Sequence, residues 1–183
     1  MKHAIPEAVE ARLVARYGEP HRHYHTWSHV TACLDARERI APSAPLEVDV
    51  ALWFHDAIYD PRAYDNEDKS AELMLAEMGE SAKPAVPLVL ATKHAAVPDS
   101  ENARIVVDAD LSILGADRET FDAYERAVRE EYAFVPDDAF RVGRAHVLRS
   151  FLDRPSIFST PAARDLWEAL ARENMTRSLR ALA

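Results

Sequence analysis

The sequence predicts an all-α protein that folds as a single domain over residues 1–183, with about nine helices. Apolar residues recur at helical spacing through nearly the whole chain, and only 4 glycines are present. No segment shows the short alternating runs and hairpin turns that strands require. The length is typical of one compact domain, and no long linker or low-complexity tract divides it.

The first four expected helices are marked by breaker and capping residues. We expect the first over Pro6–Tyr17 and the second after the segment HRHYHT. The third begins near Leu46 and is dense in apolar residues, which predicts a central position in the fold. Asn66 is a favourable N-cap for the fourth helix, and Gly79 should end it.

The remaining five helices are expected over residues 84–95, 101–114, 117–134, 136–153 and 160–182. Prolines stand at or near the start of three of them, where the missing N–H costs nothing. Gly115 is the expected stop of the helix that begins at Glu101, and Thr160 with Pro161 should cap the last.

The charge balance limits the classes of partner. With 31 acidic and 22 basic side chains the formal charge is −9, which disfavours binding to a nucleic-acid backbone. A small phosphorylated substrate is still compatible, since a metal and a few local cations can reverse the field inside one pocket. The homo-oligomeric state is left open.

Targeting signals and disulfides are not expected. The opening residues have no apolar signal segment, and no run approaches the ~18 apolar residues of a membrane span. The single cysteine, Cys33, is expected to be a small buried packing residue. We therefore expect a soluble, cytoplasmic protein with no membrane partner.

Two aspartates distinguish the faces of the expected helix over residues 101–114. Asp108 and Asp110 are two positions apart and therefore about 200° apart around the axis. Asp110 shares the apolar stripe, whereas Asp108 is expected to pair with Arg104 on a mixed face. A buried carboxylate needs a cation, hydrogen bonds or a proton, so metal ligation and a hydrogen-bonded acid both remain open for Asp110.

The adjacent residues His55 and Asp56 pose the same question near the end of the apolar third helix. An imidazole and a carboxylate on successive residues can chelate one borderline divalent ion, although such a dipeptide also occurs by chance. Upstream, the segment HRHYHTWSHV holds half of the chain's 8 histidines. His25 and His29 have i,i+4 spacing and could form a local site, while the other two are expected to be solvated loop residues.

The order of these residues along the chain resembles the HD-domain superfamily of metal-dependent phosphohydrolases. The resemblance covers most of the chain and is carried by the segments YHTWSHV, LWFHDAIYD, DNEDKSAELM, ATKH and VVDADLSILG. The chain is especially similar to a subgroup of small predicted bacterial HD hydrolases. Guanosine polyphosphate hydrolases of the superfamily carry Ala-Asp-Arg-Leu where this chain has Ala-Asp-Leu at 109–111, so their substrate is not expected here.

The resemblance implies an HD-type helical bundle that binds a divalent metal ion. It assigns His29, His55, Asp56 and Asp110 as the ligands, with Asp56 also essential to catalysis. The implied reaction is cleavage of a phosphate ester or anhydride of a small, nucleotide-like metabolite by metal-activated water.

Further site residues follow from the resemblance, each with a plain structural alternative. Glu67 is the candidate general base, or it stabilises the first turn of its helix. His25, Lys93 and His94 are candidates for substrate phosphate binding, although Lys93 and His94 would also suit a helix C-terminus. Two other functions stay open: a non-catalytic nucleotide-binding or regulatory HD protein, and an HD-type di-iron oxygenase.

Overall fold

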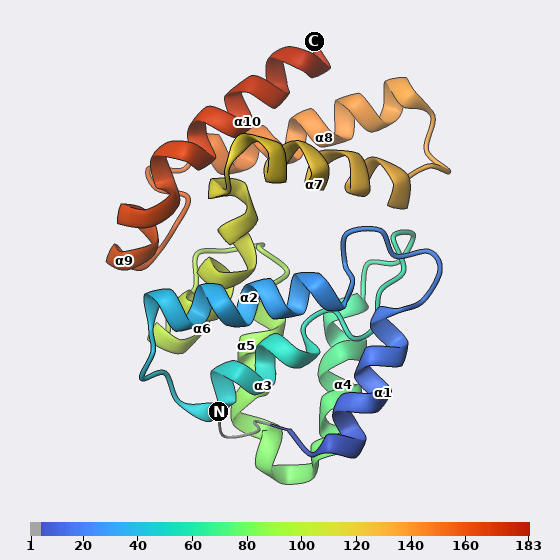
Figure 1. Cartoon of the computed structure of the whole chain (residues 1–183), viewed down its shortest axis with the longest axis vertical. Helices are drawn as coiled ribbons and strands as arrows, with labels where there is room; N and C mark the ends of the chain where they lie inside the picture. Colours follow the sequence, from blue (N-terminus) through green and yellow to red (C-terminus); the bar gives the residue numbers. More distant parts are fainter. Residues whose placement is uncertain (1–4) are drawn as a thin grey trace. The chain divides into compact units, whose positions relative to one another are not determined.

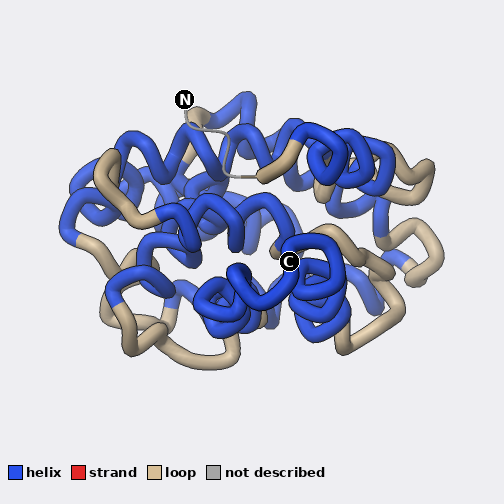
Figure 2. The backbone as a smooth tube through the Cα atoms, turned by 90° about the horizontal axis from the view of Figure 1, so that it is seen from below, coloured by secondary structure: helices blue, strands red, loops and turns tan. Residues whose placement is uncertain are grey.

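The computed structural model describes residues 5–183 and is helical throughout, as the sequence predicts (Figures 1 and 2). No residue in this range lies in a strand. The chain divides into two compact units, the first ending at Asp110 and the second formed by Leu111–Ala183. A single domain, as expected from the sequence, stays a prediction.

The first unit carries every residue that the sequence analysis assigned to the site. Its α-helices are α1 (Glu7–Tyr17), α2 (Trp27–Ile40), α3 (Leu46–Phe54), α4 (Asn66–Met78), α5 (Val86–Ala91) and α6 (Glu101–Asp110), with a 3-10 helix at Gly79–Ala85 before α5.

The second unit begins with a 3-10 turn that continues directly from α6. Its elements are the 3-10 helix Leu111–Gly115, α7 (Arg118–Glu131), α8 (Asp137–Leu152), α9 (Pro161–Ala163), a π turn at Arg164–Glu168 and α10 (Ala169–Leu182). The last three form one continuous helical stretch. As predicted, the Thr160 side chain caps its start by accepting a hydrogen bond from the N–H of Ala163.

Eight α-helices of nine or more residues lie between residues 5 and 183, fewer than the nine expected. The difference arises at residues 84–95, where one regular helix was predicted. Pro84 lies inside the 3-10 helix, and α5 has only 6 residues. Proline has no N–H to donate, and after Ala91 the main chain tightens into bonds from Thr92 to Val89 and from Lys93 to Leu90. The predicted helix is therefore reduced to a short α-helical segment.

Further boundaries differ from the prediction. The helix expected over residues 101–114 is α-helical only to Asp110 and continues as the 3-10 helix Leu111–Gly115, so Gly115 lies inside that turn. Asn66 is the first residue of α4 and not its cap, because its side chain exchanges hydrogen bonds with the main chain of Asp60. Gly79 ends α4 as predicted, with a φ of 69° that favours glycine. The third helix ends at Phe54, so His55 and Asp56 follow the helix instead of lying within it.

Helix α3 is central in the first unit, as its composition predicts. Val48, Ala51, Leu52 and Phe54 have no exposed surface, and the helix contacts α2, α5 and α6. Helix α2 also lies along α6 (Figure 1). The first turn of α2, the end of α3 and the end of α6 each carry a predicted metal ligand. No helix in the described part of the chain meets the length and hydropathy needed to cross a membrane.

We predict that Gly115→Ala destabilises the second unit. A Cβ at Gly115 would lie 2.4 Å from the Cβ of Trp167 and 2.8 Å from its main chain, so the chain must shift at a cost of about 1–3 kcal/mol in the free energy of unfolding. Gly143→Ala is the control, because a Cβ there meets nothing within 4 Å in α8 and should stabilise by about 0.5–1 kcal/mol. Urea denaturation measures both, and unchanged stability of Gly115→Ala would contradict the packing described.

Candidate metal centre

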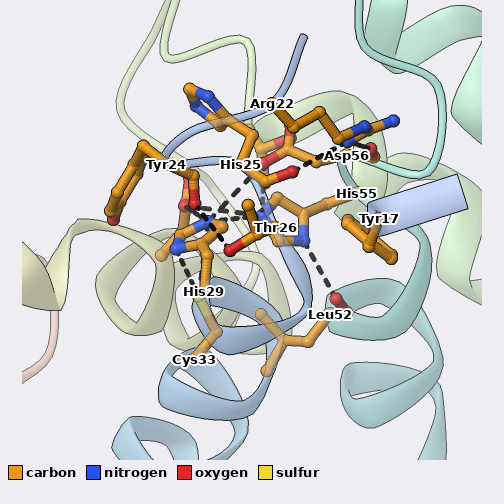
Figure 3. Close-up of polar contacts among 12 residues, drawn as sticks. Tyr17, Arg22, Tyr24, His25, Thr26, His29, Cys33, Leu52, His55 and Asp56 are labelled. Atoms are coloured by element: carbon orange, nitrogen blue, oxygen red, sulfur yellow. Dashed lines mark hydrogen bonds and ion pairs between the residues drawn. The ribbon is translucent and has the colours of Figure 1, made fainter. Parts of the chain in front are cut away.

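His55 lies directly after the last turn of α3 with only 1% of its surface exposed. Its Nδ1 is 2.9 Å from the carbonyl oxygen of Leu52 (Figure 3). A carbonyl only accepts, so Nδ1 carries the proton and donates it. In the neutral ring this leaves the lone pair on Nε2, and such a main-chain contact is how metal-binding imidazoles are usually oriented.

His29 lies in the first turn of α2 and is likewise buried. Its main-chain N–H donates to the carbonyl of Thr26, which starts the helix. The imidazole points toward that of His55, with their Nε2 atoms 3.1 Å apart (Figure 3). The Nε2 atoms of a residue in α2 and a residue directly after α3 therefore face one position.

Asp110 is the last residue of α6, and its two carboxylate oxygens face different partners. Oδ1 is 3.2 Å from Nε2 of His29 and 3.5 Å from Nε2 of His55. Oδ2 is 3.0 Å from Nε2 of His94. The Asp110 carboxylate therefore points to the place where both imidazoles meet.

The prediction for Asp108 is wrong. Asp108 has no exposed surface, and it is not on a mixed, solvated face. The Arg104 guanidinium donates to the carbonyl oxygens of Pro98 and Asp99. Four consecutive residues of α6, from Val106 to Ala109, are buried, so this helix has no solvent-facing side in its last turn.

Four donor atoms in this cluster have the spacing that one ion requires. The distances are 3.0 Å between His55 Nε2 and Asp56 Oδ2, 3.1 Å between the two imidazoles, and 3.2–3.5 Å for the contacts of His29 with both carboxylates. With bonds of about 2.1 Å, donors on one ion lie about 3.0 Å apart in an octahedron and about 3.4 Å apart in a tetrahedron. These contacts are therefore compatible with ligands of a single cation.

Cys33 lies in the same cluster. The buried residues His29, Cys33 and His55 and the partly buried Asp110 could hold a metal ion, since one donor atom of each lies within 4.8 Å of the others. However, the Cys33 sulfur is 3.6 Å from Nδ1 and 3.7 Å from Nε2 of His29, which places it beside the ring. An ion on the lone pair of Nε2 would lie more than about 4 Å from this sulfur, whereas a Zn–S bond is about 2.3 Å. Asp56 Oδ2, 3.0 Å from Nε2 of His55 and 3.5 Å from Nε2 of His29, is the alternative fourth donor, and its role as a ligand stays a prediction.

The cluster is strongly polarised. Burial alone would lower the pKa of His55, but Asp56 and Asp110 outweigh it and raise this pKa well above its usual value. Burial would likewise raise the pKa of Asp110, yet hydrogen bonds from the imidazoles, His29 first, lower it well below its usual range. The two carboxylates thus stabilise positive charge on the imidazoles. The electrostatic potential between these side chains therefore favours a cation.

His94 and His25 lie beside the cluster, and their assignment to substrate binding stays a prediction. His94 contacts Asp110 as described and has a φ of 53°, the left-handed region that non-glycine residues rarely adopt. The His25 ring stacks on Tyr59 with centroids 4.1 Å apart, and its centroid is 5.8 Å from that of His29. Both residues are partly exposed.

Lys93 and Glu67 are not brought into the cluster. Lys93 Nζ forms an ion pair with Asp68 at 2.7 Å. Glu67 lies partly exposed in the first turn of α4, and no polar contact between residues 5 and 183 links it to the four donor residues. The roles of general base and phosphate ligand stay predictions.

The residue that the sequence analysis missed is Arg22, whose side chain is fully buried against the main chain of Asp56. Nothing in the sequence distinguishes it from a solvated arginine in a polar loop. The neighbouring His21 and His23 are exposed, as predicted for loop histidines.

Comparison of the chain with family models, curated proteins and solved structures finds no match.

We predict that Asp110→Asn weakens metal binding at least ~10-fold, because it removes the charge of a ligand. Asp108→Asn is the matched control, since it removes the same charge two residues away on the same helix and should leave metal affinity intact. Metal titration of the two purified variants measures whether Asp110 or Asp108 contributes to metal affinity. A metal-free Asp108→Asn protein would show that the donor set is misassigned.

A second prediction concerns the sulfur. Cys33→Ala should leave metal content unchanged, and the Co²⁺-loaded protein should lack a thiolate charge-transfer band, because the sulfur lies beside His29 and not on the ion. Loss of metal in Cys33→Ala, or a thiolate band in the wild-type protein, would replace Asp56 by Cys33 in the donor set.

Proposed function

We propose that this protein is a metal-dependent phosphohydrolase of the HD type that acts on a small, nucleotide-like phosphorylated metabolite. The observation that supports the proposal is the convergence of His29, His55, Asp56 and Asp110 with the spacing of ligands on one ion. A donor set of two imidazoles and two carboxylates suits a borderline or hard divalent ion such as Mn²⁺, Fe²⁺, Co²⁺ or Zn²⁺.

The donor set leaves room for a substrate. Four protein ligands fill four of the six positions of an octahedral ion. A divalent ion bound there would supply polarisation of a phosphoryl oxygen and a lowered pKa for water. The His94 contact on Oδ2 of Asp110 keeps Oδ1 directed at the two imidazoles, so the carboxylate needs no reorientation when substrate binds.

The partly exposed rings of Tyr24 and His25 border the same position. The Tyr24 ring centroid is 4.7 Å from that of His29 and 5.0 Å from that of His25. An imidazole can donate to a phosphate oxygen, and an aromatic ring offers a face for the organic part of the substrate. We assign this side of the cluster to substrate binding.

A two-ion centre is a second candidate, supported by the bridging position of Asp110. Its Oδ1 faces His29 and His55, while its Oδ2 faces His94. Carboxylates that present one oxygen to each of two positions are typical of two-metal hydrolases and of di-iron enzymes. A stoichiometry of two ions per chain, together with oxygen consumption, would favour the oxygenase. Two ions with phosphate release would favour a two-metal hydrolase.

We expect the purified protein to release phosphate or an alcohol from a panel of nucleotides, p-nitrophenyl phosphate and bis-p-nitrophenyl phosphate in the presence of Mn²⁺ or Co²⁺. Asp56→Ala should reduce turnover at least ~100-fold while circular dichroism remains helical, because the loss is of the ion and not of core volume.

The control for this experiment is Lys69→Ala, which changes an exposed ion pair with Asp65 on α4 and should retain full turnover. Hydrolysis that survives both chelation and Asp56→Ala would refute the proposed reaction. Metal binding without turnover on any phosphorylated compound would favour the non-catalytic binding protein.

A further inference from the structure

Arg22 lies in the loop between α1 and α2, and its side chain has no exposed surface. Its Nη1 donates to the carbonyl oxygens of His25 at 3.0 Å and Asp56 at 2.7 Å. Its Nη2 donates to the carbonyl of Ala57 at 3.1 Å, and Nε pairs with Glu19. Fully buried arginines are rare, and three of these four contacts are to main-chain oxygens around the metal centre.

These carbonyls need donors because α3 ends at Phe54. The carbonyl groups at and beyond a helix C-terminus have no N–H of the same helix to accept from. The N–H of Ala57 still bonds to the carbonyl of Phe54, but Asp56 and Ala57 themselves have left the helix. A buried carbonyl without a donor is unfavourable. The planar guanidinium of Arg22 donates to the carbonyls of both Asp56 and Ala57.

Two aromatic rings hold the guanidinium in place. Its central carbon is 5.1 Å from the ring centroid of Tyr17 and 5.5 Å from that of Tyr59, within the range of cation–π attraction. The Tyr17 hydroxyl donates to the carbonyl of Trp53 at 3.0 Å. Tyr17 and Arg22 thus cap neighbouring carbonyls at the same end of α3.

We propose that Arg22 is a positioning residue for the metal centre. It joins the main chain of His25, in the loop that leads into the first turn of α2 and His29, to the main chain of Asp56. This connection sets the separation of the His29 imidazole from the Asp56 carboxylate, which must stay near 3.5 Å for both to bind one ion. The inference depends on the proposed metal site, but not on the reaction assigned to it.

Lysine cannot replace this function. An ammonium carries charge but lacks the planar fork whose nitrogens reach three carbonyls at fixed angles. Arg22→Lys therefore retains the charge near Asp56 and removes the geometry. The chain also provides a matched control at the other ends of the same two helices, where Arg37 of α2 pairs with Asp49 of α3 through Nε and Nη2 at 2.7 and 3.1 Å.

The experiment titrates wild type, Arg22→Lys and Arg37→Lys with Co²⁺. It records affinity, the d–d absorption spectrum at saturation, and thermal unfolding of the metal-free proteins. We expect Arg22→Lys to bind Co²⁺ at least ~10-fold more weakly, as for loss of a group that orients a ligand, and with an altered d–d spectrum. Arg37→Lys should lower thermal stability without changing either property of the bound ion.

Each outcome bears on the inference. Equal Co²⁺ affinity and an identical spectrum for wild type and Arg22→Lys would overturn the positioning role of Arg22 but not the metal site. The same conclusion would follow if Arg22→Lys and Arg37→Lys changed Co²⁺ binding equally. A wild-type protein that binds no Co²⁺ would overturn both the positioning role and the metal site. If Arg22→Lys does not fold, Glu19→Ala provides the test. This substitution removes the partner of Arg22 Nε and keeps the guanidinium. It must weaken Co²⁺ binding about two- to fivefold. Unchanged affinity in that variant would overturn the inference.

Discussion

The carboxylates of Asp56 and Asp110 are nearly buried, with 14% and 13% of their side chains exposed, and everything else in the first unit must accommodate them. An isolated buried carboxylate costs several kcal/mol. Each carboxylate is tolerated because the imidazoles of His29 and His55 face it, and those imidazoles are themselves buried. The packing of α2, α3 and α6 is therefore tied to the charges at their ends, and removal of one member leaves the others unmatched.

Helix ends, and not helix faces, provide this arrangement. His29 lies in a first turn, His55 directly after a last turn and Asp110 at a last residue. Such positions allow side chains from three directions to meet, but they leave main-chain carbonyls without helical partners. Arg22 and the Tyr17 hydroxyl satisfy these carbonyls at the end of α3. Arg22 and Tyr17 therefore cap the end of α3 and also fix the main chain next to His55 and Asp56.

The sequence predicted most helices and the residues that converge, because caps, breakers and polar residues within apolar stripes are local signals. It failed at residues 84–95, where a proline inside the segment weakened the helix that periodicity favoured. It failed for Asp108, since periodicity separates two faces but does not say whether both are covered. Arg22 escaped prediction because its partners are main-chain carbonyls, which every residue has, so no pattern of residue types identifies them.

The backbone conformation of His94 has a consequence for how this chain can evolve. A left-handed residue other than glycine costs about 1–3 kcal/mol, and here the cost is incurred at the residue that contacts Oδ2 of Asp110. Glycine or asparagine at this position would relieve the strain and give a more stable protein without the imidazole. Selection for thermal stability alone would therefore act against His94, and its retention would record selection on the centre itself.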